Sequence, residues 1–153
     1  MNRTREVIIL IAEDDDGHAR LVEKNLSRAG LNNSIRRFAD GQAILDFLFR
    51  RGDPEQVRVP GQAYLLLLDI RMPKIDGVEV LRQLKQDPEL KQMPVLMLTT
   101  TDDPREVQRC HAIGCASYIV KPVDYDKFAD AMRNLGLYIS LVEVPELSSA
   151  QPA

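Results

Sequence analysis

Five short apolar runs alternate with longer amphipathic segments along most of the chain. Each run is bounded by polar or turn-forming residues, a pattern typical of strands that are buried in a parallel sheet. The run at 64–68, with the sequence YLLLL, shows the pattern most clearly. The predicted strands cover residues 7–12, 34–38, 64–68, 95–98 and 117–120.

Between and after these runs, apolar residues recur at helical spacing, so that each segment has one face to bury. In the first segment Leu21, Val22 and Leu26 share a face. Asp16 is placed to cap the start of this helix, and Gly30 is placed to end it. The predicted helices cover residues 16–29, 41–49, 77–87, 104–113 and 125–135, the last capped by Asp124 and closed by Gly136.

This regular alternation of strands and helices predicts an α/β fold, an open parallel sheet with helices on both faces. A length of 153 residues favours one domain, which we place at 1–136. Residues 137–153 form a C-terminal arm, apolar to about residue 145 and then disordered. Residues 50–62 are polar and contain Gly and Pro, which predicts an exposed loop.

Polar groups follow four of the predicted strands. Glu13 and Asp14 come after the first strand, Asp69 after the third, Thr99 after the fourth and Lys121 after the fifth. In open parallel sheets, ligands bind outside the carboxyl ends of the strands. We therefore expect these acids, the hydroxyl and the ammonium to meet at one site.

Composition narrows the class of protein. The chain is 44% apolar and 28% charged with a net charge of −3, as expected of a soluble globular protein without a nucleic-acid partner. No apolar stretch approaches the roughly 20 residues that cross a bilayer, and the N-terminus does not resemble a signal peptide, so we expect a cytoplasmic protein without a membrane partner. Cys110 and Cys115 fit neither a redox motif nor a zinc site, and are expected to be packed free thiols.

Several other acids compete for the same roles. Asp15 or Asp16 could serve in place of Glu13, although Asp16 is well explained as a helix cap. Asp76 is a rival to Asp69, but an Asp-Gly pair is typical of turns and the side chain can cap the next helix. Glu13 and Asp14 are favoured because they immediately follow the apolar strand.

The ordered set of Glu13-Asp14, Asp69, Thr99 and Lys121-Pro122 resembles the receiver domain of two-component response regulators, over about residues 6–136. The resemblance implies a flavodoxin-like five-stranded sheet in the order 2-1-3-4-5. It also implies that Asp69 accepts a phosphoryl group from a sensor histidine kinase, which makes the chain a signalling protein rather than an enzyme. The backbone carbonyl of Arg71 would join Glu13, Asp14 and Asp69 in binding Mg²⁺.

The residue types suit these roles. Clustered carboxylates repel one another, and a hard cation such as Mg²⁺ satisfies them. A carboxylate can attack phosphorus to form an aspartyl phosphate. Lys121 is a compact cation for one phosphoryl oxygen, and the Thr99 hydroxyl can donate to another. Arg71 and Thr101, each two residues past a site residue, border the site and are expected to tune loss of the phosphoryl group.

Tyr118, three residues before Lys121, matches the switch aromatic of the resembled family. Thr99 moving toward a phosphoryl group would leave room for the Tyr118 ring to turn inward. A static, half-buried tyrosine is the alternative.

The arm from Leu137 to Pro145 is apolar and β-prone, so we expect another segment to cover it. It either folds back on its own domain or, as we favour, pairs with a second copy to form a homodimer. Together with the loop at 50–62, the arm resembles stand-alone response regulators that partner phytochrome-type kinases. No output domain is recognised after Gly136.

Two other classes of protein use related chemistry. A Mg²⁺-dependent phosphatase of the haloacid-dehalogenase type also has an aspartyl nucleophile, but it needs a second Asp where this chain has Arg71. A flavodoxin would need a loop rich in Ser, Thr and Gly after the first strand, where this chain has four acids.

Overall fold

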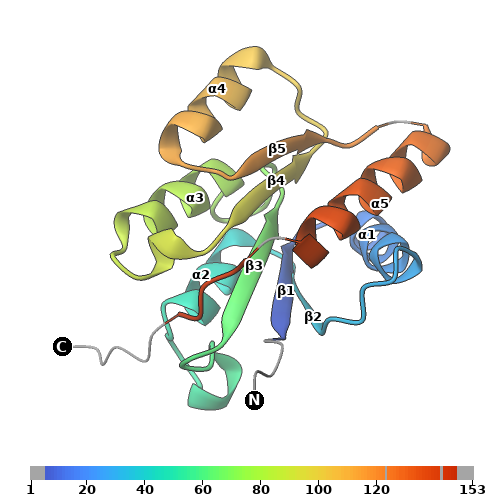
Figure 1. Ribbon diagram of the computed structural model, residues 1–153. Coiled ribbons are helices and arrows are strands. Elements are labelled where there is room, and N and C mark those ends of the chain that lie inside the picture. The colour runs from blue at the N-terminus through green and yellow to red at the C-terminus, as the bar shows by residue number, and fades with distance from the viewer. Residues whose placement is uncertain (1–5, 123, 142, 148–153) are drawn as a thin grey trace.

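The computed structural model describes residues 6–122, 124–141 and 143–147. Five parallel strands form one sheet in the order β2-β1-β3-β4-β5 (Figure 1). This arrangement confirms the predicted fold class and strand order. The strands are β1 (Val7–Ala12), β2 (Ile35–Phe38), β3 (Ala63–Leu68), β4 (Val95–Thr99) and β5 (Ser117–Val120). The α-helices are α1 (Asp16–Arg28), α2 (Gly41–Leu48), α3 (Gly77–Gln86), α4 (Pro104–Ile113) and α5 (Tyr125–Leu141), and two 3₁₀ helices are η1 (Pro54–Gln56) and η2 (Leu90–Gln92).

Helices cover both faces of the sheet (Figure 1). On one face, α1 and α5 pack on Leu65 and Leu67 of β3. On the other face, α2, α3 and α4 pack on Leu66 and Leu68. Every residue of β3 is therefore buried, which is why its sequence is apolar without alternation. The free thiols Cys110 and Cys115 are buried on the second face, as predicted.

Aspartates cap the helices, with one difference from the prediction at α1. The Asp15 side chain accepts a 2.9 Å hydrogen bond from the backbone N–H of His18, so Asp15 rather than Asp16 is the cap. Asp16 begins the helix, and its carboxylate pairs with Arg37 on β2. As predicted, Asp124 accepts from the backbone N–H groups at the start of α5.

The last helix is longer than predicted. Helix α5 continues through Gly136 to Leu141, so the prediction that it closes at Gly136 and that residues beyond it are β-prone was wrong. Gly136 lies where α5 passes close to the end of α1, and a Cβ atom there would be 2.8 Å from the Cβ of Ala29. The glycine thus serves close helix packing, and Ile139 beyond it is buried in the core.

Residues 143–147, which we call the C-terminal strap, fold back to the amino end of β3, where Glu146 pairs with Ala63 (Figure 1). Val144 is buried with the α1/α5 core and Leu147 with the core on the opposite face. Leu147 exchanges backbone hydrogen bonds with Gly61 and Gln62, at 2.8 and 3.2 Å. This part of the arm therefore folds back on its own domain, through the contacts of Glu146 and Leu147. The remaining predicted disorder, at 148–153, lies outside the described residues.

The connection at 50–62 is mostly exposed, as predicted, but Arg58 within it is buried. Its Nε donates to the carbonyl oxygen of Leu48 at 2.8 Å, and its Nη2 lies 2.9 Å from Glu89 Oε1. Arg58 thus fixes the loop to both α2 and the η2 region.

Among the described residues, no helix has the length and apolar character that a membrane crossing requires.

Candidate functional site

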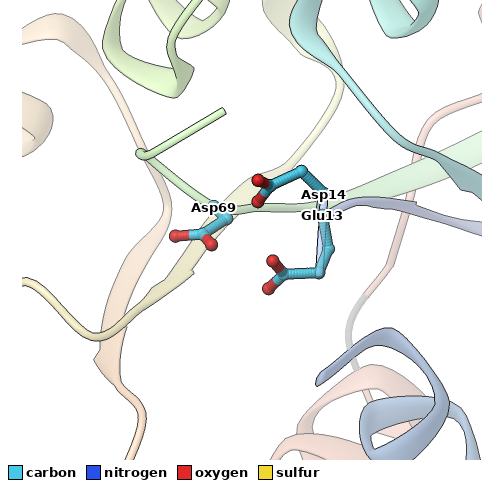
Figure 2. A group of neighbouring side chains, drawn as sticks. All are labelled: Glu13, Asp14 and Asp69. Atoms are coloured by element: carbon cyan, nitrogen blue, oxygen red, sulfur yellow. The ribbon is translucent and has the colours of Figure 1, made fainter. Parts of the chain in front are cut away.

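Three carboxylates meet where β1 and β3 end (Figure 2). Oxygens of Glu13, Asp14 and Asp69 all lie within 4.8 Å of one another. The two strands run side by side, and the Asp69 N–H donates a 3.0 Å hydrogen bond to the carbonyl of Ala12. Parallel pairing therefore brings together acids that are far apart in sequence. Glu13 and Asp69 are buried, whereas Asp14 is exposed.

The turn after β3 holds Asp69 in place. Its Oδ1 accepts a 2.7 Å hydrogen bond from the N–H of Ile70. The Ile70 carbonyl in turn accepts from Gly77 N–H at 2.7 Å. Gly77 begins α3, and a Cβ atom there would lie only 2.0 Å from the carbonyl oxygen of Asp69. A glycine at position 77 is therefore required for this close approach.

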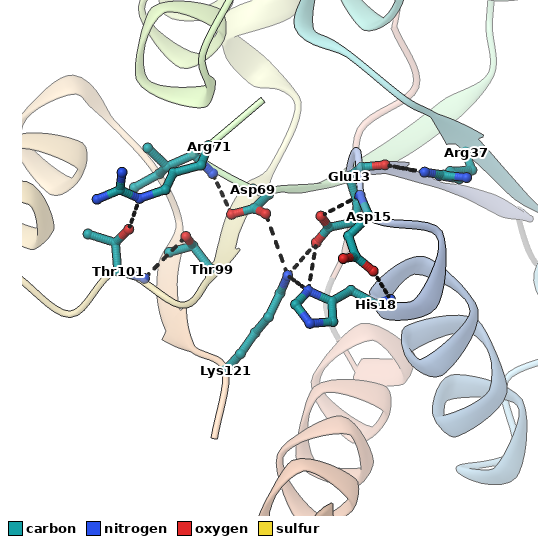
Figure 3. Close-up of polar contacts among 10 residues, drawn as sticks. Glu13, Asp15, His18, Arg37, Asp69, Arg71, Thr99, Thr101 and Lys121 are labelled. Carbon is teal, nitrogen blue, oxygen red and sulfur yellow. Dashed lines mark hydrogen bonds and ion pairs between the residues drawn. The ribbon is translucent and has the colours of Figure 1, made fainter. Parts of the chain in front are cut away.

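Lys121 brings its ammonium group between the two buried acids (Figure 3). The Nζ donates to Glu13 Oε1 and lies 3.5 Å from Asp69 Oδ2. It also lies 3.2 Å from His18 Nδ1. Burial raises the pKa of Glu13 to about 7, against the opposing effect of Lys121 and with a further increase from the nearby Asp69 charge. Burial thus disfavours the ionised form of Glu13 in spite of its contact with Lys121.

Thr99 and its neighbours form a second group beside Asp69 (Figure 3). The fully buried Thr99 hydroxyl accepts a 3.3 Å hydrogen bond from the N–H of Thr101. The Thr101 side chain accepts from Arg71 Nε at 3.3 Å, and its carbonyl accepts from the Tyr118 hydroxyl at 2.7 Å. One residue, Thr101, therefore links the loops after β3 and β4 with strand β5.

Residues 9–133 match the family model of the response regulator receiver domain. The chain belongs to this family. A crystal structure of a response regulator receiver domain from Rhodospirillum rubrum superposes on this receiver with a TM-score of 0.85 at 49% identity, covering 93% of this chain and 99% of that one.

Two further proteins are similar. Response regulator Rcp1 of Synechocystis sp. is 35% identical over 114 residues, which are 74% of this chain and 76% of Rcp1. A crystal structure of Mn²⁺-bound Rcp1 has a TM-score of 0.82 at 30% identity and covers 90% of this chain and 98% of its own. A crystal structure of the phosphorylated cyanobacterial phytochrome response regulator RcpA has a TM-score of 0.81 at 26% identity. It covers 94% of this chain and 100% of its own.

The competing acids of this receiver have other roles. Asp15 caps α1 and Asp16 pairs with Arg37. Asp76 caps α3, accepting a 2.9 Å hydrogen bond from the N–H of Glu79. The three-carboxylate cluster contains Glu13, Asp14 and Asp69, the set that the strand ends favoured.

Two residues near the acids were missed in the sequence. His18 Nδ1 lies within hydrogen-bonding distance of Lys121 Nζ. Helical geometry could have indicated this contact, because residue 18 is in the first turn of the helix that follows Glu13-Asp14. Arg37 donates through Nε and Nη2 to the backbone carbonyl of Glu13, at 3.0 and 2.8 Å. Its position depends on the register between β1 and β2, for which no sequence signal exists.

The cluster fits a hard divalent cation. All three of its side chains offer carboxylate oxygens, which Mg²⁺ prefers, and exposed Asp14 leaves one side open to water. A cavity of about 560 Å³ adjoins the cluster, and Asp14, Arg71 and Thr101 are among its lining residues. The open space beside the cluster thus lies between the β3–α3 and β4–α4 loops.

Proposed function

We propose that Asp69 accepts a phosphoryl group from a sensor histidine kinase and that the resulting change in conformation signals through protein contacts. The observation that carries this proposal is the buried Asp69 carboxylate, within 4.8 Å of two further carboxylates and 3.5 Å from the ammonium of Lys121. A nucleophile, an oxygen-rich cation site and a fixed positive charge are what phosphoryl transfer to a carboxylate requires.

Glu13, Asp14 and Asp69 would hold Mg²⁺, and by family resemblance the backbone carbonyl of Arg71 would complete the protein ligands. When bound, the ion neutralises negative charge on the phosphoryl oxygens. Burial is the chief cause of the raised pKa of Glu13, and a bound divalent cation would offset this cost of ionisation. The geometry favours Glu13 over Asp15 and Asp16, because the Glu13 carboxylate lies in the cluster with Asp14 and Asp69.

Asp69 and the groups that contact it would have distinct roles in phosphoryl transfer. Asp69 Oδ1 is held by the N–H of Ile70, which leaves Oδ2, facing Lys121, to attack phosphorus. The new O–P bond forms as the P–N bond of the phosphohistidine breaks, and the imidazole nitrogen leaves with the bonding pair. Lys121 then contacts a phosphoryl oxygen in place of Asp69.

Thr99 and Tyr118 would carry the signal outward. The Thr99 hydroxyl proton is free to donate to a phosphoryl oxygen, because the hydroxyl acts as an acceptor toward Thr101. If Thr99 turns, the Thr101 backbone loses a partner, and the same residue holds the Tyr118 hydroxyl. Movement at Thr99 thereby reaches the ring of Tyr118 on β5 through a single intermediate residue. Phosphorylation would shift the population between two packings of this region.

The kinase partner would be of the phytochrome type. Support comes from the likeness to RcpA, described as a cyanobacterial phytochrome response regulator, over 94% of this chain. The alternative of a haloacid-dehalogenase-type phosphatase is disfavoured by position 71, where Arg71 donates to Thr101 instead of offering a second carboxylate.

A homodimer through the C-terminal arm is a further part of the proposal. With the strap folded back, Leu137 and Tyr138 of the arm remain 60% and 40% exposed on α5, an apolar pair suited to a second copy. The double change Leu137→Ser with Tyr138→Ser should convert a dimer into a monomer by light scattering, and Asn134→Ser on the same helix is the control. A monomeric wild type, or a dimer that survives the double change, would contradict this.

Incubation with acetyl phosphate and Mg²⁺, followed by intact-mass measurement, tests the central claim. The wild type should gain one phosphoryl group and Asp69→Asn none. Asp76→Asn is the matched control, since Asn can still cap α3 and labelling should persist. Undiminished labelling of Asp69→Asn would overturn the proposal, and rapid turnover of acetyl phosphate without mass gain would favour a phosphatase. Transfer of labelled phosphate from a phytochrome-type kinase tests the partner.

A further inference from the structure

We propose that Arg37 is a positioning residue for the Mg²⁺-binding acids, an inference that rests on the proposed function. Arg37 lies on β2, outside the carboxylate cluster, with about a quarter of its side chain exposed. Its guanidinium group reaches the end of β1, where Nε and Nη2 both donate to the carbonyl oxygen of Glu13 at 3.0 and 2.8 Å (Figure 3).

The backbone of Glu13 is held by β2 at both of its polar groups. Its N–H donates to the carbonyl oxygen of Phe38 at 3.0 Å, and its own carbonyl accepts from Arg37. The regular pairing between β1 and β2 ends one residue earlier, with Ala12 opposite Phe38. Through Arg37, β2 therefore also fixes the next peptide group, at which the chain turns from Glu13 into Asp14.

The third nitrogen of the guanidinium, Nη1, pairs with the carboxylate of Asp16 at the start of α1. One side chain thus spans the loop from the last residue before the turn to the first residue of the helix. The positive charge faces Asp16, which lies outside the carboxylate cluster. Arg37 acts on the metal-binding acids through the position of the backbone between them.

Rigid placement of ligands matters for Mg²⁺, because this ion demands near-ideal octahedral geometry. Residues that orient metal ligands typically change metal affinity 10- to 100-fold when they are replaced. The planar guanidinium directs two donors, Nε–H and Nη2–H, at one carbonyl oxygen, an arrangement that a lysine ammonium cannot reproduce. Replacing Arg37 by Gln should therefore weaken Mg²⁺ binding by about 10-fold, and replacing it by Lys by a smaller factor.

Two control variants test whether the effect of Arg37 comes from its contact with the Glu13 backbone or from its ion pair and the general charge of β2. Asp16→Asn removes the ion pair and leaves the two bonds to Glu13 in place. Arg36→Gln removes the neighbouring arginine of β2, whose guanidinium lies 4.8 Å from the ring centroid of Phe47 rather than at the site. Both variants should bind Mg²⁺ within about twofold of the wild type, as expected where no ligand-orienting contact is lost.

The experiment measures the Mg²⁺ dissociation constant of the full chain by calorimetry, together with acetyl-phosphate labelling at increasing Mg²⁺. For Arg37→Gln we expect the half-saturating Mg²⁺ concentration to rise about 10-fold, while the labelling rate at saturating Mg²⁺ stays near that of the wild type. Partial recovery in Arg37→Lys, which keeps one donor, would distinguish positioning from a general loss of structure.

The outcomes are separable. A wild type that binds no Mg²⁺ would overturn the proposed function and this inference together. A wild type that binds, with Arg37→Gln binding equally well, would overturn only the role of Arg37. An equal loss in Asp16→Asn would also overturn it, because the ion pair and not the backbone contact would then account for the effect.

Discussion

The Tyr118 hydroxyl donates a 2.7 Å hydrogen bond to the carbonyl oxygen of Thr101. The bond ties β5 to the loop that follows β4, and the N–H of the same threonine is bonded to the hydroxyl of Thr99. Burial, with further increases from nearby acidic groups, raises the pKa of Tyr118 to about 12, so the phenol stays protonated and keeps donating at physiological pH.

The first prediction concerns this contact. Binding of beryllofluoride with Mg²⁺, a phosphoryl mimic, should draw Thr99 away from Thr101 and change the ring environment of Tyr118. NMR of ring-labelled protein checks this, with Tyr64, buried near the amino end of β3, as the internal control. Identical Tyr118 signals with and without the mimic would contradict the switch.

Tyr118→Phe should also lower the free energy of unfolding by about 1 kcal/mol through loss of one hydrogen bond.

The second prediction concerns pH and Glu13. The pKa of this carboxyl is about 7 in the folded protein, against an ordinary value of 4.5. Between these values the folded state binds a proton that the unfolded state has released, so without metal the free energy of unfolding falls as pH rises through this window. Mg²⁺ competes with the same proton, and its affinity should therefore rise with pH until about pH 7.

Urea unfolding and Mg²⁺ calorimetry across this pH range measure both effects. Glu13→Gln should remove its share of the pH dependence of stability. Glu79 on α3 is the matched control: its pKa is lowered to about 2, chiefly by hydrogen bonds from Arg82, so Glu79→Gln should leave the slope unchanged at pH values well above 4.5. A slope that survives intact in Glu13→Gln would argue against the raised pKa.

The third prediction concerns the turn behind Asp69. A Cβ at Gly77 would lie 2.0 Å from the carbonyl oxygen of Asp69 and 2.8 Å from Ile70 Cα, both backbone atoms that cannot move aside cheaply. Gly77→Ala should therefore cost roughly 3 kcal/mol in the free energy of unfolding and impair phosphorylation. Gly17→Ala, in the first turn of α1, is the control and should change stability by less than about 1 kcal/mol. Equal stabilities for the two variants would refute this account of Gly77.

The fourth prediction concerns the C-terminal strap. Leu147 is fully buried, so Leu147→Ala should destabilise the domain by roughly 3 kcal/mol through lost burial and a cavity. Glu143→Ala, at an exposed position of the same segment, should have little effect. Urea unfolding measures both. If Leu147→Ala matches the wild type, the strap does not contribute to the core of the isolated chain.

Local signals predicted most of the elements correctly. Strand β3 is apolar at every position because both of its faces are buried, and aspartates mark the starts of α2, α3 and α4, where their side chains cap backbone N–H groups. The end of α5 was mispredicted because glycine is used both to end helices and to allow close packing. At Gly136 the neighbouring Ala29 decides between these uses, and it lies far away in sequence.

The sequence by itself determined the repeating strand-helix pattern and the order in which acids, hydroxyl and ammonium follow the strands. Parallel pairing places all strand ends at one edge, so this order was enough to nominate Asp69 and its partners. Only the tertiary structure decided that Arg37 holds the Glu13 backbone and that the C-terminal strap packs into both cores. These contacts depend on strand register and on packing between segments remote in sequence, which local preferences do not encode.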